Sequence, residues 1–289
     1  MTWLLLALTT AFSLATADAL SKRAINTGGV DDLVIVWVRE GYALPFLALA
    51  FLFVPVPAVD ATFWLTVAVL LPLEIAALVL YVKAIDLSPL SLSVPFLALS
   101  PVFIVVIAFV FLGERPAPLG IAGIVMITAG AYVLNAGASR HGILGPIRAI
   151  AAEPGSVIMI VVSLIYSVTS TLGKVAINHS DPVFFGFFYP FLLTIVLTVV
   201  VAWRGRLRLV AARPRVFIPI GFFTAAMVIT HFLALSLTHV AYMIAVKRMS
   251  LVFSVIYGRL LFAEERIPER LVGSAVMAAG VALIAISWA

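Results

Sequence analysis

The sequence predicts an all-α polytopic membrane protein with ten transmembrane helices, arranged as two inverted five-helix repeats. The prediction comes from the composition, from the number of apolar segments and from an internal repeat. Of the 289 residues, 64% are hydrophobic and 11% are charged, and the mean hydropathy is +1.23. A soluble domain carries about a quarter charged residues. Nearly the whole chain is therefore expected to lie in the bilayer of a cell membrane.

A helix that crosses the hydrocarbon core needs about 20 mostly apolar residues. Ten segments meet this requirement: 2–20, 31–53, 62–82, 88–111, 117–136, 156–177, 182–203, 217–237, 240–262 and 268–288. The first of them lacks the basic region of a secretory signal, so we interpret it as a membrane helix and not as a cleaved leader. Pro95 and Pro101 are expected to kink the fourth segment.

A repeat appears when the chain is shifted by 150 residues, which places 111–130 over 261–280. Polar and turn-forming residues coincide at this offset: Glu114 with Glu264, Pro118 with Pro268, Gly123 with Gly273 and Gly130 with Gly280. Because each copy holds five helices, the second copy enters the membrane from the opposite side, as in many secondary carriers. We divide the chain into a first repeat, 1–137, a linker, 138–155, and a second repeat, 156–289.

Two motifs mark corresponding places in the repeats, LGERP at 112–116 and AEERIPER at 263–270. With ten helices in two halves, the pattern resembles the EamA-type branch of the drug/metabolite transporter superfamily, over essentially the whole chain. The resemblance implies a carrier of small solutes that works by alternating access, with a central cavity between the repeats.

The charged loops predict an orientation. One side, which holds loops 1–2, 3–4, 5–6, 7–8 and 9–10, carries twelve Lys and Arg residues, against two on the side of the termini. Because Lys and Arg concentrate on the cytoplasmic side, both termini are expected to be extracytoplasmic. The family resemblance more often implies cytoplasmic termini, and we follow the charges.

Charged residues inside the predicted spans are the main candidates for a site, because a charge at the bilayer centre costs about 2.5–3.5 kcal/mol. Lys247 and Arg248 are adjacent in an apolar segment, and Glu74 lies in the middle of another. Glu74 can pair with either cation, which leaves the other for a ligand anion. Tyr81 shares the helical face of Glu74.

Structural pairing remains an alternative for the two cations, and Asp18–Arg39 is the simplest structural pair elsewhere. Triose-phosphate and related phosphate translocators of the same superfamily hold substrate phosphate with adjacent Lys and Arg in helix nine. VKRMSLVFS, which contains Lys247 and Arg248, is similar to that region. The resemblance implies that these two residues bind the anionic part of the substrate.

Helix 156–177 carries a polar face at helical spacing, echoed by Thr9, Ser13 and Thr16 in the first helix. The members of this face are Ser163, Ser167, Ser170, Thr171 and Lys174. Such a face can line a transport path, and small hydroxyl residues also serve as helix-packing contacts. His231 has two interpretations as well, a hydrogen-bonded helix contact or a proton-coupling group.

The motifs and residue types that the sequence lacks restrict the class of function. The sequence has no cysteine, no HExxH, no P-loop and no nucleophile motif with a partnering histidine. We therefore expect that the protein is not an enzyme and holds no metal and no cofactor. We expect the surplus of Lys and Arg to set the orientation of the chain in the membrane and not to bind nucleic acid. The predicted function is a secondary transporter of a small organic anion bearing a carboxylate or phosphate, with the bilayer and the solute as partners. Coupling to protons or to a counter-substrate stays open. So do two alternatives, an exporter of amino acids or amphipathic metabolites and a lipid-phosphate headgroup flippase.

Overall fold

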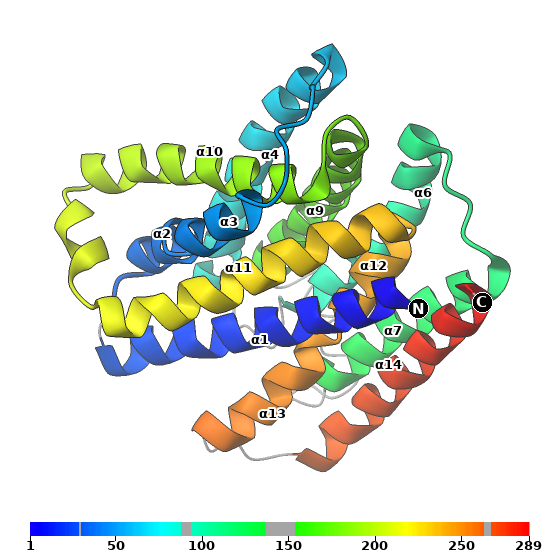
Figure 1. Cartoon of the computed structure of the whole chain (residues 1–289). Helices are drawn as coiled ribbons and strands as arrows, with labels where there is room; N and C mark the ends of the chain where they lie inside the picture. Colours follow the sequence, from blue (N-terminus) through cyan, green and yellow to red (C-terminus); the bar gives the residue numbers. More distant parts are fainter. Residues whose placement is uncertain (29, 88–93, 137–153, 263–266, 289) are drawn as a thin grey trace.

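The computed structural model describes residues 1–28, 30–87, 94–136, 154–262 and 267–288, and within these ranges it is helical without strands (Figure 1). The first half contains α1 (Thr2–Gly28), α2 (Asp32–Gly41), α3 (Leu44–Phe51), α4 (Ala61–Leu87), η1 (Val94–Leu99), α6 (Ser100–Leu112) and α7 (Pro118–Ala136). The second contains α9 (Pro154–Asn178), α10 (Pro182–Trp203), η2 (Leu207–Ala211), α11 (Pro214–Leu237), α12 (Val240–Lys247), α13 (Ser250–Phe262) and α14 (Ile267–Trp288).

The predicted membrane helices are confirmed. Seven helical segments of the described chain are long and apolar enough to span a bilayer, and three shorter apolar helices, 96–112, 118–133 and 272–288, fill the remaining predicted places. α1 and α4 run several residues further than predicted, to Gly28 and Leu87. The predicted linker falls mostly outside the described residues, and α9 already begins at Pro154.

Three predicted helices are broken in the middle, which the apolar count alone does not show. The segment 31–53 breaks between α2 and α3, where Pro45 in the first turn of α3 supplies no backbone N–H. Pro101 stands likewise in the first turn of α6, at its junction with η1. The segment 240–262 breaks at Arg248 and Met249 without a proline, because the chain tightens there into i→i−3 hydrogen bonds such as Met249 N–H to the Val246 carbonyl, 2.9 Å.

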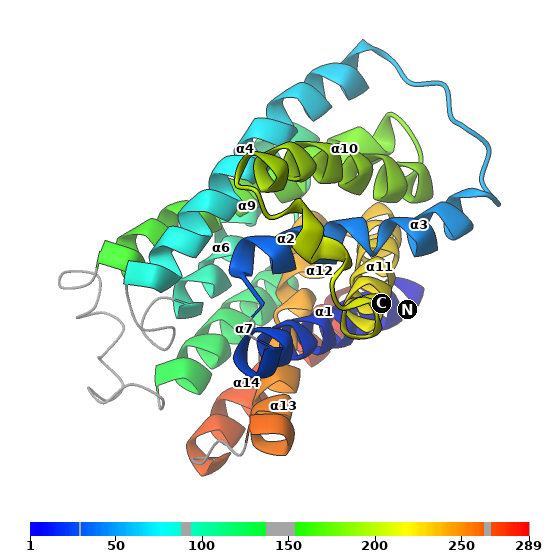
Figure 2. The ribbon, with the colours of Figure 1, turned by 90° about the vertical axis from the view of Figure 1, so that its left-hand side faces the viewer.

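The repeat appears directly in the helix packing. α7 lies against α14, and α1 lies against α11 just as α9, its counterpart, lies against α4 (Figures 1 and 2). A Cβ atom on Gly123 would lie 2.6 Å from the Gly280 carbonyl oxygen, and one on Gly130 would lie 2.8 Å from that of Gly273. Since Gly123 and Gly130 correspond to Gly273 and Gly280, each contact is the repeat-related copy of the other. The interface of α7 and α14 therefore lies on the pseudo-twofold axis.

Both chain termini lie at one end of the bundle, here called the termini end (Figure 1). The ring of Trp3 stacks on Tyr242 at a centroid distance of 6.4 Å and meets Trp288 edge-on at 6.0 Å. At the opposite end, the Tyr42 hydroxyl donates to the Val210 carbonyl at 2.9 Å. The connection from α10 through η2 to α11 thus lies at the end away from the termini, as the ten-helix topology predicts (Figure 1).

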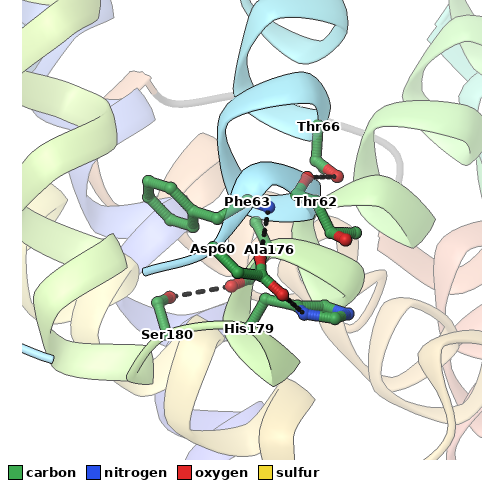
Figure 3. Close-up of polar contacts among 7 residues, drawn as sticks. All are labelled: Asp60, Thr62, Phe63, Thr66, Ala176, His179 and Ser180. Carbon is green, nitrogen blue, oxygen red and sulfur yellow. Dashed lines mark hydrogen bonds and ion pairs between the residues drawn. The ribbon is translucent and has the colours of Figure 1, made fainter. Parts of the chain in front are cut away.

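A further contact at the termini end joins the starts and ends of neighbouring helices (Figure 3). The Asp60 carboxylate accepts a hydrogen bond from the backbone N–H of Phe63, 2.9 Å, in the first turn of α4. Its other oxygen lies 2.8 Å from Nδ1 of His179, which follows α9. Asp60 therefore caps one helix and ties it to the next repeat.

Candidate functional site

The candidate site lies at the break between α12 and α13, where Lys247 ends one helix and Arg248 follows it. The seven residues before Lys247, Val240 to Val246, are all buried, with at most 3% of each exposed. Lys247 and Arg248 themselves are half-buried. An apolar, fully packed helix therefore carries two cations at its inner end.

Arg248 is held by groups of the first repeat. One terminal N–H group, Nη2, donates to the hydroxyl of Ser100, the first residue of α6. That hydroxyl donates to the Leu97 carbonyl at 2.8 Å, and the Ser167 hydroxyl donates to the Ser100 carbonyl at 3.1 Å. The site thus lies where the broken helices of the two repeats meet, since Ser100 corresponds to Ser250 at the start of α13.

The charge of Arg248 is not neutralised by direct contact. Within the described ranges, neither Arg248 nor Lys247 forms an ion pair with a carboxylate, and Nε of Arg248 is buried without a hydrogen-bond partner. The guanidinium interacts electrostatically with Tyr166, with Tyr81 and with the neighbouring cation Lys247. A buried donor on a charged group costs about 1–3 kcal/mol when it has no partner.

Glu74 occupies the middle of α4, as predicted, and interacts electrostatically with Lys247. Thr169 of α9 is a polar neighbour of its carboxyl group, and Glu74 makes no direct ion pair with Lys247. Of the two pairings that the sequence left open, Glu74 interacts with Lys247, and Arg248 has no carboxylate partner among the described residues.

The second acidic group of this region is Glu40, near the end of α2, which interacts with Arg39 and Glu74. Arg39 forms the expected ion pair with Asp18, so this structural pairing is confirmed. Tyr81 is near both groups of charges, since it interacts with Asp18, Arg39 and Arg248.

His231 and Tyr189 add two more polar groups. Nδ1 of His231 is buried without a hydrogen-bond partner among the described residues, and the imidazole interacts electrostatically with Lys247. The Tyr189 hydroxyl is also buried and unpartnered there, and it interacts with Glu74 and Glu40. These groups extend the polar region from α12 towards α10 and α11.

The polar face of α9 divides into two parts. Ser163, Ser167 and Thr171 are completely buried, and Ser167 and Thr171 donate to carbonyls one turn earlier at 2.7 and 2.9 Å. Ser170 is half-buried. The placement of Ser163 and Ser167 favours the packing interpretation for these two hydroxyls, because Ser167 also bonds the backbone at the start of α6.

Lys174, predicted to end this polar face in a cavity, is engaged at the termini end. Its ammonium group lies 2.5 Å from Oε1 of Glu114 and donates to the Thr238 carbonyl at 2.6 Å. Oε2 of Glu114 accepts a hydrogen bond from the backbone N–H of Val240 at 2.8 Å. Lys174 thus joins α9 to the start of α12, and no contact between it and Lys247 or Arg248 occurs within the described chain.

Sequence reasoning missed Ser100, Tyr166, Thr169 and Tyr189. Tyr166 carried a usable signal, because it stands between Ser163 and Ser170 on the polar face of α9. Ser100 carried none, because its role depends on a contact with Arg248, 148 residues away. Among the described residues, no group of three or more His, Asp or Glu side chains is placed to hold a metal ion.

Comparisons with known proteins agree with this architecture. The model of the EamA-like transporter family matches residues 1–136 and 153–286. A solved structure titled "Crystal structure of protein" is 18% identical, with 99% of each chain covered and a TM-score of 0.71, a likeness that shows the fold alone. No curated protein sequence matches the chain.

Proposed function

The chain belongs to the EamA-like transporter family, as a multi-pass membrane transporter of small solutes, and from this premise we propose that it carries a small organic anion. The anion bears a carboxylate or phosphate and binds at Arg248 and Lys247 near the middle of the membrane. Transport proceeds by alternating access between the two repeats, with substrate and cations meeting at the junction of η1, α6, α12 and α13.

The observation that carries the proposal is a guanidinium that has unused donors and, among the residues that the structure describes, no acidic partner. Arginine offers five N–H donors in a planar fork, and in the described chain Arg248 donates through Nη2 to Ser100, while its Nε is unpartnered. Carboxylates and phosphates match this fork with two parallel hydrogen bonds. Lys247 adds a second positive charge beside it.

Glu74 supplies the balancing charge when the site is empty. It interacts electrostatically with Lys247, which reduces the repulsion between the two neighbouring cations. A protonated Glu74 leaves the site more positive and favours the bound anion. Loss of this proton during the cycle would restore the negative charge beside Lys247 and release the anion. This assigns Glu74 the role of counter-charge or proton carrier, with His231 as the second titratable group near Lys247.

Two other substrates suit parts of the same region. Glu40 and Glu74 add acidic groups to a basic site, which favours a zwitterion such as an amino acid. The phosphate of a lipid headgroup would use the same donors on Arg248 as a soluble phosphate. The thermal-shift experiment below tests both of these substrates against a small organic anion.

The orientation that we propose places both termini outside the cytoplasm, in the plasma or inner membrane. Its support is the twelve-to-two asymmetry of Lys and Arg between the two ends.

A thermal-shift series on the purified protein tests the function, because a ligand that binds the folded state raises its melting temperature. The ligands are glycerol 3-phosphate, succinate, glutamate and a short-chain phosphatidic acid, and the proteins are the wild type, Arg248→Ala and Arg115→Ala. Arg115 is a matched control, an exposed cation that lies 5.3 Å from the ring of Phe109. An anion should stabilise the wild type and Arg115→Ala but not Arg248→Ala. Equal stabilisation of all three proteins would contradict the proposal, and a response to glutamate or phosphatidic acid alone would favour the corresponding alternative.

A further inference from the structure

Three parts of the chain meet at the carboxylate of Glu114. Glu114 itself follows α6, Lys174 belongs to the end of α9, and Val240 begins α12. Both oxygens are used, one by the Lys174 ammonium at 2.5 Å and the other by the Val240 N–H at 2.8 Å. The side chains of Lys174 and Glu114 are 13% and 8% exposed, so this ion pair is largely shielded from water.

The carboxylate is well placed to hold α12. The first N–H groups of a helix have no partner inside the helix, and negative charge is favourable there because of the helix dipole. Lys174 strengthens the same junction from the other side by donating to the Thr238 carbonyl at 2.6 Å. The beginning of α12 is therefore bonded on both sides of His239.

α12 joins this junction to the candidate anion site. It has eight residues, about 12 Å at 1.5 Å per residue. Its first seven residues are buried, and a closely packed helix moves as a rigid unit because interiors leave few voids. Glu114 fixes its outer end, and at its inner end Arg248 is bonded to Ser100. A displacement of one end must displace the other.

Aromatic rings close the termini end around the same helix. The Tyr242 hydroxyl of α12 accepts a hydrogen bond from the Ala117 N–H at 3.0 Å, and its ring contacts both Trp3 and Trp288. Trp3 and Tyr242 are 2% and 1% exposed. The first turn of α12 is thus part of the seal at the termini end.

We infer that Glu114 and Lys174 form a latch that closes the termini end and, through α12, positions Lys247 and Arg248. The positioning part rests on the proposed function, because it concerns the anion site. In a cycle of alternating access, opening of the termini end breaks the bonds of this latch and shifts α12, so the cations move as the gate opens. Glu114 and Lys174 are positioning residues and do not touch the substrate.

The sequence repeat contains both residue types a second time. Glu264 stands 150 residues after Glu114, and Lys22 stands 152 residues before Lys174. Glu264 lies outside the described residues. The recurrence of both residue types in the sequence fits a role in the cycle, where the two ends of the molecule exchange roles.

Labelling of a single cysteine tests the latch, because the chain has none of its own. Ala241 is completely buried in the first turn of α12, and Ala241→Cys places the thiol directly behind the latch. A membrane-impermeant maleimide is added from the termini side of proteoliposomes. Labelling should accelerate at least about tenfold in Glu114→Ala, which loses both charge-assisted bonds. In Glu114→Gln the effect should be smaller, because the amide oxygen still accepts from Val240.

Asp60→Ala is the matched control, because it breaks the Asp60–His179 pair at the same end without touching α12, and it should leave labelling unchanged. Labelling of folded Glu114→Ala at the rate of the parent would overturn the latch, as would equal acceleration by Asp60→Ala. If Glu114→Ala does not fold, Lys174→Gln decides in its place, with acceleration expected and an unchanged rate overturning the inference.

Binding of glycerol 3-phosphate and succinate separates this inference from the proposed function. The latch predicts that Glu114→Ala weakens anion binding several-fold, whereas Arg115→Ala does not. Lys174→Arg keeps the charge and should bind the anions like the wild type, whereas Lys174→Gln should bind them more weakly. Full affinity in Glu114→Ala together with its loss in Arg248→Ala would overturn the positioning role and leave the function standing. If neither anion binds the wild type, the anion function fails, and the labelling rates alone decide the latch.

Discussion

Arg248, the residue on which the proposed site depends, is oriented by a serine of the opposite repeat. The Ser100 hydroxyl accepts a hydrogen bond from the guanidinium and donates one to the Leu97 carbonyl. A hydroxyl can orient a cation without neutralising it, which keeps the positive charge available for a ligand. At this scale the sequence identified the cations and Glu74, since charges in apolar segments stand out. It could not identify Ser100, because serine is common in membrane helices and its partner is distant in the chain.

Replacement of Ser100 by alanine tests this role. We expect Ser100→Ala to destabilise the protein by about 1.5–3 kcal/mol, the usual contribution of a hydrogen bond to a charged group, and to weaken anion binding. Ser163→Ala is the control, because the Ser163 hydroxyl is buried without a partner in the described structure and its loss should not destabilise. Melting temperatures and anion titrations of both variants provide the measurement, and equal effects would count against the role of Ser100.

Asp60, outside the membrane-spanning segments, predicts a dependence on pH. The hydrogen bond from the Phe63 N–H lowers the pKa of this carboxyl below its ordinary value of about 3.9, and the contact with His179 lowers it further by a smaller amount. A lowered folded-state pKa stabilises the protein fully above the unfolded value, and the contribution disappears as the pH falls through the folded value. Asp60→Ala should therefore melt below the wild type at pH 6, and the difference should shrink as the pH falls below about 3.9, the ordinary pKa of the carboxyl. A constant difference across this range would exclude the charge as its cause.

Among the elements, the helices that carry the site are the broken ones. Two of the helix breaks lie at prolines, Pro45 and Pro101, because proline removes a backbone hydrogen-bond donor. The break after Lys247 has no such marker, and it arises where Arg248 reaches across to Ser100. Helix counts and approximate bounds were thus predictable from apolar length, whereas the interruption that exposes the two cations depends on tertiary contacts.

The packing of α7 on α14 gives a prediction at this scale. Gly123→Ala places a methyl group against the Gly280 carbonyl oxygen, 2.6 Å from the ideal Cβ position. The backbones must separate, and overpacking of this kind costs about 1–3 kcal/mol. Ala122→Val, on an exposed position of the same helix, should be neutral. Melting temperatures of the two variants check the prediction, and a Gly123→Ala protein as stable as the wild type would contradict the close approach.

For the whole molecule, the inverted repeat was visible in the sequence because Glu, Pro and Gly coincide at one offset. Its consequence, a pseudo-twofold axis through α7 and α14, appears in the reciprocal glycine contacts. The role of Lys174 was not visible, because a lysine at the end of a polar face looks the same whether it faces a cavity or Glu114. Only the three-dimensional contact between Lys174 and Glu114 distinguishes the two possibilities.

The orientation of the whole molecule is open to a direct test. Twelve Lys and Arg residues at one end against two at the other predict that both termini are extracytoplasmic. A C-terminal reporter that fluoresces only in the cytoplasm should stay dark, while one that is active only outside should give a signal. Bright cytoplasmic fluorescence would reverse the orientation and leave the fold unchanged.

The most direct measurement for the central claim is uptake by proteoliposomes of the anion that most stabilises the purified protein. Wild type, Arg115→Ala and Arg248→Ala are reconstituted at equal amounts of folded protein, as determined from their melting curves. The account predicts uptake by the first two and a loss of at least about tenfold in Arg248→Ala, the effect of removing about 1.4 kcal/mol of binding. Uptake by folded Arg248→Ala at the wild-type rate would contradict the assignment of Arg248 as the anion-binding residue.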